Sequence, residues 1–261
     1  MSSDTVAPDR ANRRGVWHSA GVTHRGRVRK VNEDAFILRP DIGLWAVADG
    51  MGGHRAGDVA SRMVVEALLE IREAPTFAER LDRIDDAIED VNRRLVRDGV
   101  ESGSGGMMGS TVAILSLDPS GLGALLWAGD SRIYRLRDGT LQQLSTDHSQ
   151  VEEYVREGRI SREEAATHPE SNVITRALGS RHGEVLEADL CDVESGDRFL
   201  LCSDGLTRHI RDTELATFLG QSDTSAVCAN LLDTTLERGS VDNTTVVVID
   251  IQDTAEGGDR R

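Results

Sequence analysis

Four aspartates stand where a hydrophobic run ends and the chain can reverse direction. They are Asp49, Asp130, Asp204 and Asp242, each beside glycine or another turn-forming residue. A single aspartate in such a place is ordinarily a turn residue, because its side chain accepts hydrogen bonds from nearby backbone amides. Four such junctions far apart in the sequence predict strands that bring carboxylates to one pocket.

Carboxylates gathered in one pocket repel one another unless protons or cations neutralise them. A ligand set built from carboxylates favours hard ions such as Mg²⁺ or Mn²⁺. Two such ions, about 3.5–4 Å apart, can share a bridging water, lower its pKa and stabilise an in-line phosphoryl displacement. The pattern therefore predicts a two-metal hydrolase.

The four junctions differ in what they offer a metal ion. Asp49 is the candidate for a bridging ligand, because Gly50 lets backbone and metal approach closely and adds a carbonyl oxygen. Asp204 and Asp242 are expected to complete the pair of ions, and Asp130 is placed for a third, weaker one. Each of these residues, taken alone, has an ordinary turn or surface position as its alternative.

Four further residues could take part in the chemistry. Glu33 and Asp34 are expected to bind metal or to orient metal-bound waters, with solvated surface as the alternative. Arg29 is the candidate for gripping a substrate phosphate, since its guanidinium matches phosphate oxygens, although it lies in a basic patch that could merely be exposed. His54 is a candidate general acid, because an imidazole titrates near neutrality, or else an exposed histidine in a glycine-rich loop.

A cysteine-based mechanism has one apparent signal. Cys202 and Arg208 have the Cys-x₅-Arg spacing of a cysteine-dependent phosphatase loop. Such a loop needs positive potential to lower the pKa of the thiol and to hold a phosphate dianion. Asp204 within the segment would repel both, so Cys202 is predicted to be an apolar residue of a buried strand.

Composition excludes several other classes of protein. The chain has 261 residues and a formal net charge of −15, which argues against a nucleic-acid binder. No apolar run approaches membrane-spanning length, and the N-terminus lacks the apolar core of a signal peptide. The three cysteines have no zinc spacing and are expected to be reduced. We expect a cytoplasmic protein with no membrane contact, and a monomer by default.

Hydrophobic periodicity predicts one domain, 16–252, between flexible tails at 1–15 and 253–261. Helices are expected at 58–72 and 76–97, an antiparallel pair separated by Pro75, and later at 212–219 and 222–238. Short strands are expected at 110–117, 122–128, 133–136, 140–144, 185–190, 198–203 and 244–251. Because strands and helices come in blocks, an α+β layered fold with antiparallel sheets is favoured. The polar stretch 147–182 is expected to pack lightly and move.

The motifs also occur in a recognisable order. They are Arg29-x₃-Glu33-Asp34, Ala48-Asp49-Gly50-Met51-Gly52-Gly53-His54, Gly109-Ser110-Thr111, Gly129-Asp130-Ser131-Arg132, Asp147-His148, Cys202-Ser203-Asp204-Gly205 and Asp242-Asn243-Thr244. Each is short, but the series from about Trp17 to Ile251 resembles the metal-dependent type 2C (PPM) Ser/Thr protein phosphatases. Asp-Gly-Met-Gly-Gly-His resembles the bacterial branch best.

The resemblance implies a four-layer α-β-β-α sandwich, in which two antiparallel sheets pack face to face between helix pairs. It implies hydrolysis of phosphoserine and phosphothreonine by a water that bridges two Mn²⁺ or Mg²⁺ ions, with a third ion in some members. The implied roles are bridging by Asp49, a carbonyl ligand from Gly50, direct ligation by Asp204 and Asp242, ligation through water by Glu33, a third-ion ligand in Asp130, and phosphate binding by Arg29. Residues 147–182 correspond to the family's mobile flap.

The resemblance further implies phosphorylated protein substrates, among them a bacterial Ser/Thr kinase. The N-terminal half is also similar to phosphatases linked to type VI secretion. The main rival is a pseudophosphatase, a binding module of the same fold, which the retained carboxylates disfavour. A two-metal nuclease or phosphodiesterase would need a basic track for its polymer, and the chain has no long Lys/Arg run.

Overall fold

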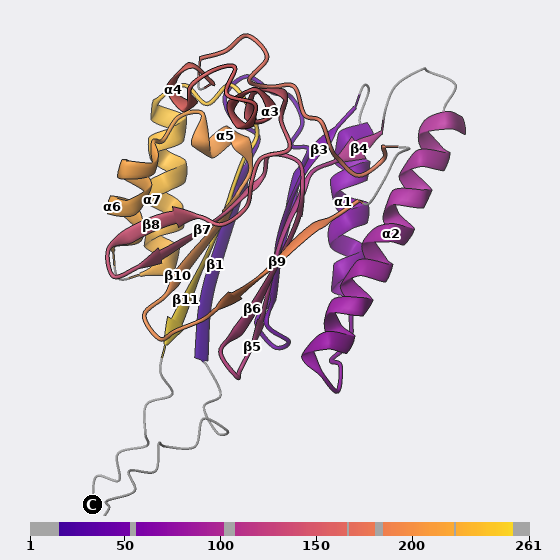
Figure 1. The fold of residues 1–261 in the computed structure, drawn as a ribbon, viewed down its shortest axis with the longest axis vertical. Helices are drawn as coiled ribbons and strands as arrows, with labels where there is room; N and C mark the ends of the chain where they lie inside the picture. The colour runs from indigo at the N-terminus through magenta and orange to yellow at the C-terminus, as the bar shows by residue number, and fades with distance from the viewer. Residues whose placement is uncertain are drawn as a thin grey trace, which may run out of the picture.

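Two antiparallel sheets pack face to face, and helices cover the outer side of each (Figure 1). The structure, a computed structural model, describes residues 16–52, 56–101, 108–165, 167–180, 185–221 and 223–252. This architecture is the α-β-β-α sandwich that the resemblance implies, so the predicted fold class is confirmed. The expected tails at 1–15 and 253–261 lie outside the described residues.

The first sheet has the strand order β1-β11-β10-β7-β8. Its strands are β1 Val16–His24, β7 Arg132–Arg137, β8 Thr140–Gln143, β10 Arg198–Cys202 and β11 Thr244–Gln252. The β7–β8 hairpin turns at Asp138 and Gly139, whose φ angles are 50° and 74°. Positive φ at both central residues is what an Asp-Gly turn is suited to provide, so this predicted hairpin is confirmed.

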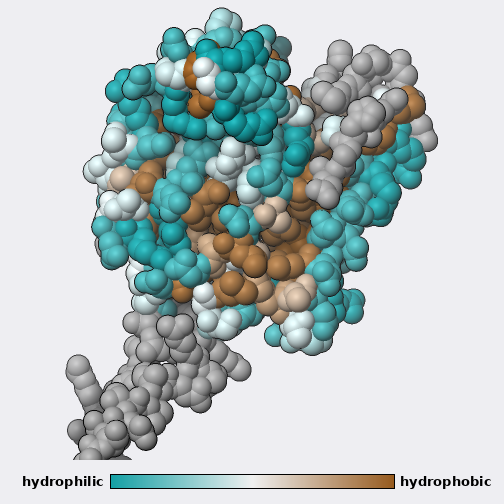
Figure 2. All heavy atoms as spheres, in the orientation of Figure 1, coloured by the Kyte–Doolittle hydropathy of each residue, from teal (hydrophilic) through white to brown (hydrophobic). Residues whose placement is uncertain are grey.

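The second sheet has the order β2-β3-β5-β6-β9, with the short β4 also paired to β3. Its strands are β2 Asp34–Arg39, β3 Leu44–Met51, β4 Gly109–Ser110, β5 Val112–Asp118, β6 Leu122–Ala128 and β9 Glu187–Asp192. Figure 2 shows hydrophobic side chains gathered on the face where β9 forms the open edge of this sheet. Leu122 and Leu190, from β6 and β9, are exposed there.

Strand β3 shows why the sandwich has several cores. Trp45 and Val47 point into the core between the two sheets. Leu44, Ala46 and Ala48 point the other way, into the core beneath the helices. Successive side chains of a strand face opposite sides, so a strand buried on both faces must be hydrophobic along its length. The continuous apolar run before Asp49 is therefore a consequence of the layers.

The outer layers each use a pair of helices. The helices α1 Ala56–Leu69 and α2 Phe77–Glu101 cover the second sheet, and α6 Asp212–Leu219 and α7 Thr224–Glu237 cover the first. Three short helices, α3 Gln150–Arg156, α4 Arg162–Ala165 and α5 Asp204–Thr207, lie together at one end of the sandwich (Figure 1). Among the described residues, no helix has the length and apolar character needed to cross a bilayer.

Candidate active site

Asp34 and Asp49 are paired across the antiparallel β2–β3 ladder. Directly opposed residues place their side chains on one face of a sheet, so like charges there destabilise the pair unless something neutralises them. Asp34 is 7% exposed, and its Oδ2 accepts hydrogen bonds from Ser203 Oγ and Thr245 Oγ1, both at 2.7 Å. These two bonds join the edge of the second sheet to the end of the first.

Asp204 and Asp242 lie at a common end of the first sheet, because β10 runs into α5 where its antiparallel neighbour β11 begins. Gly205 makes the close approach possible. A Cβ atom at that position would lie 1.8 Å from the carbonyl oxygen of Asn243. Only a residue without a side chain fits there, so the sequence Asp-Gly places the Asp204 carboxylate against the turn that carries Asp242.

Asp130 enters the site from the second sheet, directly after β6. It follows Gly129, whose φ of 106° is a conformation that favours glycine. The side chain of Asp130 is buried. Burial raises the pKa of its carboxyl to about 7, and the charges of Asp204 and Asp147 add to the effect. The electrostatic coupling to Asp204 shows that the site spans the ends of both sheets.

The aspartates raise one another's pKa values because they share one pocket. Burial raises the pKa of Asp49 well above its ordinary value, and the charges of Asp34, Asp204, Asp130 and Asp242 raise it further. Burial also raises the pKa of Asp34 to about 7, despite the two hydroxyl groups that favour its charged form. The structure thus brings the four predicted junctions together, and Asp34 with them.

Three oxygens of this pocket lack a partner. The Oδ1 atoms of Asp34, Asp130 and Asp204 are buried and make no hydrogen bond in the structure. A buried polar atom without a partner costs free energy, and a carboxylate oxygen more than most. Hard divalent cations prefer oxygen donors of this kind, so the donor set fits Mn²⁺ or Mg²⁺.

Two arginines neutralise the pocket in the structure. Arg29 Nη2 lies 2.8 Å from Asp242 Oδ2, and this hydrogen bond raises the pKa of Arg29. Arg208 donates to Asp204 Oδ2, and its Nη1 lies 3.8 Å from Asp242 Oδ2. Within the described part of the chain, no three His, Cys, Asp or Glu side chains are arranged to hold an ion as they stand. Direct ligation by this set would need its side chains to rearrange, and Arg29 and Arg208 would compete with the ion for Asp204 and Asp242.

The loop that carries Arg29 and Glu33 is held by Asn243. The Nδ2 atom of Asn243 donates to the carbonyl oxygens of Arg25 and Val31, both at 3.0 Å, and its Oδ1 accepts from the Glu33 amide at 2.7 Å. Burial raises the pKa of Glu33. The loop is thereby fixed beside Asp242, which places Arg29 at the rim and Glu33 at the side of the site.

Gly50 joins this loop to the end of β3. Its amide donates to the Glu33 carbonyl oxygen at 3.0 Å. A Cβ atom at Gly50 would lie 2.0 Å from the Gly57 carbonyl oxygen, so the start of α1 packs directly against the strand end. Metal ligation by the Gly50 carbonyl stays a prediction. His54, the candidate general acid, lies outside the described residues.

Comparison with known proteins identifies the family of the chain. The sequence profile of protein phosphatase 2C matches residues 20–240, which is most of the chain. The chain belongs to the protein phosphatase 2C family. The predictions of a bacterial type 2C protein and of a Ser/Thr protein phosphatase as its enzyme class are therefore confirmed.

Bacterial relatives share much of the sequence. The Ser/Thr phosphatase stp of Listeria monocytogenes serotype 4b is 36% identical over 250 residues, which cover 93% of this chain and 99% of the relative. The Ser/Thr protein phosphatase PstP of Mycobacterium tuberculosis is 37% identical over 91% of this chain. The chain spans about half of PstP, because the match covers 46% of that protein.

Solved structures show the same fold. PppA, a key regulatory component of T6SS in Pseudomonas aeruginosa, has a TM-score of 0.85 and 40% sequence identity, with 92% of this phosphatase and 100% of PppA covered. The catalytic domain of PstP, solved in complex with two manganese ions, has a TM-score of 0.81 and 34% identity, with 92% and 100% covered.

The cysteine alternative fails on burial. Cys202 belongs to the core beneath α6 and α7 and is fully buried. Burial raises the pKa of its thiol to about 12, so the nucleophilic thiolate is disfavoured. Arg208, the other half of the Cys-x₅-Arg spacing, instead contacts Asp204. Cys202 is an apolar residue of a buried strand, as the sequence predicts.

Several residues that shape the site were absent from the sequence-based candidates. Ser203 and Thr245 hold Asp34, Asn243 holds the loop before it, and Arg208 pairs with Asp204. Ser203 and Asn243 are neighbours of predicted ligands within their own motifs, which was the available signal. Arg208 follows Asp204 by four residues, the spacing at which helical side chains meet.

Proposed function

We propose that this phosphatase removes phosphate from phosphoserine and phosphothreonine in proteins, with two divalent cations bound by its aspartates. The observation that carries the proposal is the pocket of five aspartates, in which three buried carboxylate oxygens have no partner. Relatives named as Ser/Thr phosphatases and the manganese-bound PstP domain support it. Phosphoproteins are the proposed substrates.

Asp49, Asp204 and Asp242 would hold the two ions. The Gly50 carbonyl would be a further ligand, and Glu33 would bind through water. Asp34 is paired with Asp49 on the neighbouring strand. Asp130 would contribute to a third ion. Mn²⁺ or Mg²⁺ bound there supplies an activated water and stabilises charge on the phosphoryl group. Arg29, half exposed beside Asp242, would exchange that carboxylate for a substrate phosphate, and its fork can hold two oxygens at once.

Residues 147–182 are proposed as a flap over one domain that spans 16–252. Arg132 anchors the start of this segment, with Nε and Nη2 on the Asp147 carboxylate at 3.0 and 2.7 Å. Beyond the anchor, Val151 and Ala165 are the buried side chains of α3 and α4. Light packing of this kind permits local opening at low cost.

The biological setting is proposed from the relatives. Opposition to a bacterial Ser/Thr kinase would fit a phosphoprotein phosphatase, and a type VI secretion role has support in the likeness to PppA. A cytoplasmic monomer without nucleic-acid partners agrees with the acidic composition.

Hydrolysis of a phosphothreonine peptide tests the proposal, with Mn²⁺, with EDTA and with an Asp204→Asn protein. We expect turnover that needs Mn²⁺ and falls at least about a hundredfold in Asp204→Asn, since such losses accompany removal of key electrostatic groups. Asp86→Asn, a matched change at an exposed residue of α2, should retain full activity.

The rival functions give different results in the same series. A protein that neither binds Mn²⁺ in calorimetry nor hydrolyses the phosphopeptide would indicate a pseudophosphatase. Equal turnover with Mn²⁺ and EDTA would refute the metal assignment. Release of nucleotides from DNA or RNA, without peptide hydrolysis, would favour the nuclease.

A further inference from the structure

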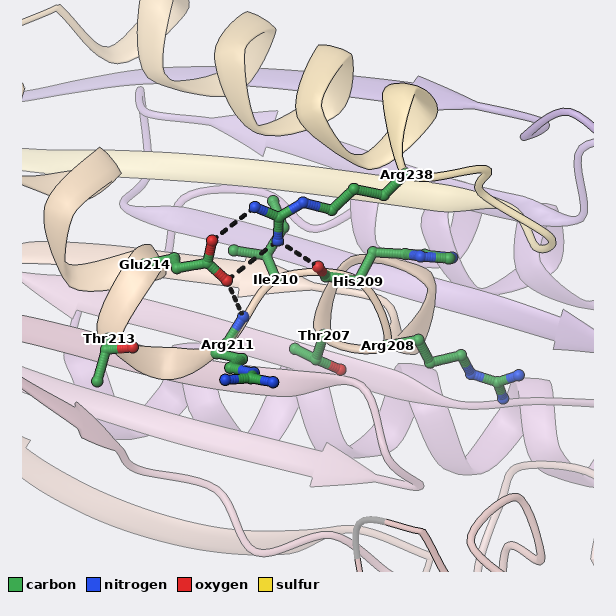
Figure 3. Close-up of a pocket in the computed structure, with 8 residues that line it drawn as sticks. All are labelled: Thr207, Arg208, His209, Ile210, Arg211, Thr213, Glu214 and Arg238. Carbon is green, nitrogen blue, oxygen red and sulfur yellow. Dashed lines mark hydrogen bonds and ion pairs between the residues drawn. The ribbon is translucent and has the colours of Figure 1, made fainter.

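A second pocket, with a volume of about 510 Å³, lies directly beside the carboxylate site. It is formed by α5, the start of α6 and the end of α7 (Figure 3). Arg208 lines it and also contacts Asp204 and Asp242. The Arg208 residue therefore belongs to both the pocket and the carboxylate site.

The pocket is positively charged, although the chain as a whole is strongly acidic. Arg208, Arg211 and Arg238 line it together with one carboxylate, Glu214. Arg238 neutralises that carboxylate, with Nη2 on Oε1 at 2.6 Å and Nη1 on Oε2 at 3.0 Å. Figure 3 shows this pair on one side of the pocket and Arg208 pointing away from it.

One side chain of the pocket, Arg211, is free to contact a ligand. The exposed Arg211 uses its backbone amide to bind Glu214, at 3.1 Å. Its guanidinium has no hydrogen bond or ion pair with any residue that the structure describes. An unpaired guanidinium in a concave site binds anions well, because its planar fork matches carboxylate and phosphate oxygens.

We propose that this pocket binds a second anionic group of the phosphoprotein substrate, close in sequence to the residue that is dephosphorylated. The ligand is a phosphate or a carboxylate, and Arg211 is its main contact. Arg208 lines the pocket and contacts Asp204, so the two sites are neighbours. An extended peptide advances about 3.3 Å per residue, so residues that flank the phosphorylated one would reach a neighbouring pocket.

The alternative, that the arginines only support the fold, accounts for Arg238 but not for Arg211. Arg238 also donates to the His209 carbonyl oxygen at 2.7 Å, and so joins α7 to the loop before α6. The Arg211 side chain makes no comparable hydrogen bond to any residue in the described ranges. The Arg211 charge helps to lower the pKa of Glu214, but its guanidinium has no direct partner, and its position beside the site favours substrate binding.

The test uses three phosphothreonine peptides that differ at one flanking position, which carries glutamine, glutamate or a non-hydrolysable phosphonate. The proposal rests on the proposed function, so the measured quantity is the ratio of kcat/KM for each anionic peptide to that for the glutamine peptide. We expect a ratio of about two to five for wild type, the range typical of exposed charge pairs. The ratio should fall as ionic strength rises.

Two variants with opposite expected effects on this ratio distinguish a role of charge from a purely structural role. Arg211→Gln should bring the ratio close to one. Glu214→Gln should increase it, because it removes the pocket's carboxylate, while its amide oxygen still accepts from the Arg211 amide. Arg94→Gln, the same chemical change on an exposed residue of α2, should keep the wild-type ratio. A preference for the phosphonate over glutamate would identify phosphate as the ligand, and the reverse would identify a carboxylate.

The two proposals fail in distinguishable ways. If no peptide is hydrolysed under any condition, the proposed function is wrong. If all three peptides are hydrolysed with equal kcat/KM, or if Arg211→Gln and Arg94→Gln give the same ratio, the second anion site is wrong while the phosphatase assignment stands.

Discussion

The positive charge of Arg208 neutralises the aspartates when no metal is bound. The same charge would repel a metal ion bound there. Arg208 contacts both Asp204 and Asp242, the carboxylates proposed to hold an ion. A guanidinium and a divalent cation repel each other at such distances, so binding of one opposes binding of the other. The chain thus carries its own neutralising charge, with which a metal held by Asp204 and Asp242 would compete.

Removal of this charge should tighten metal binding. For Arg208→Gln we expect Mn²⁺ affinity to rise by about tenfold, or about 1.4 kcal/mol, because the competing cation is gone. Isothermal titration calorimetry measures it directly, and Arg94→Gln serves as the control. Weaker Mn²⁺ binding in Arg208→Gln would show that the arginine supports the site, and would contradict this reasoning.

We expect Arg29 to contribute to substrate binding rather than to the stability of the fold. Its side chain is 51% exposed and pairs with Asp242. Hydrogen bonds to charged groups contribute about 1.5–3 kcal/mol, so Arg29→Gln should lower kcat/KM for a phosphothreonine peptide by about 10- to 150-fold. The melting temperature should stay within about 2 °C of wild type, since exposed ion pairs contribute little stability. An unchanged kcat/KM would remove Arg29 from the phosphate site.

At the level of single residues, the sequence predicted the acidic members of the pocket better than their partners. Asp49, Asp130, Asp204 and Asp242 stand out because each lies close to one end of an apolar run. Residues such as Thr245 carry no such signal: a threonine in a strand is ordinary, and its bond to Asp34 joins positions 211 residues apart. Long-range hydrogen bonds of this kind depend on tertiary structure, which local patterns do not encode.

At the level of elements, the junction between β10 and α5 controls the geometry of the site. Gly205→Ala would place a Cβ 1.8 Å from the Asn243 carbonyl oxygen, and the backbone there cannot easily give way. We expect a loss of about 1–3 kcal/mol of stability and weaker Mn²⁺ binding, because overpacking moves Asp204 away from Asp242. Urea denaturation and calorimetry measure the two effects.

A glycine elsewhere in the same layer is the matched control. Gly220 follows α6 with a φ of −71°, and a Cβ added there would lie 3.5 Å from its nearest neighbouring atoms. Gly220→Ala should be neutral or slightly stabilising, by up to about 1 kcal/mol, because it reduces the entropy of the unfolded chain. Equal destabilisation by both substitutions would mean that crowding at Gly205 is not the cause.

Most helices and strands were predicted to within a few residues, but the strands near the N-terminus were not among the predicted ranges. The strands β5, β6 and β10 and the helices α6 and α7 lie within a few residues of the predicted ranges, because their apolar patterns are long and regular. β1 was absent from the prediction, since His18, Ser19 and Thr23 interrupt its pattern. β1 becomes a strand through its full-length pairing with β11, at the other end of the chain.

At the level of the whole molecule, the order of strands could not come from local patterns. β1 pairs with β11, and the second sheet runs β2-β3-β5-β6-β9, so chain neighbours and distant segments alternate as partners. The resemblance supplied this architecture, whereas periodicity supported only antiparallel layers. The consequence for function is that the pocket forms only when both sheets are complete, because Asp34 and Asp49 come from one and Asp204 and Asp242 border the other.

A pocket of buried carboxylates makes the stability of the whole fold depend on pH and metal. The folded-state pKa values of Asp34 and Asp130 are raised from 3.8 to about 7, and those of Asp49 and Asp204 are also raised. Between about pH 4 and pH 7 the folded state therefore binds protons that the unfolded state has released. Stability falls with rising pH wherever the folded state binds more protons.

The metal-free phosphatase in EDTA should accordingly melt at a lower temperature at pH 8 than at pH 5. The expected difference is several degrees, since 1 kcal/mol shifts the melting temperature by about 2–4 °C in proteins of this size. Glu214, whose pKa is lowered to about 2, exerts its effect below this window. His209, whose pKa is lowered from 6.5, works in the opposite direction, but as one group against the four aspartates and Glu33, whose pKa is also raised.

Two further experiments test whether the carboxylate pocket causes this pH dependence of stability. Mn²⁺ at pH 8 should restore the melting temperature, because a ligand that binds only the folded state stabilises it in proportion to its occupancy. Asp130→Asn should flatten the pH dependence in EDTA, because the amide removes one of the raised carboxyls and lessens repulsion on Asp204. Differential scanning calorimetry from pH 5 to pH 8 measures both. A melting temperature that rises with pH in EDTA would mean that the aspartates are not buried together in solution, and the metal site proposed from them would lose its physical basis.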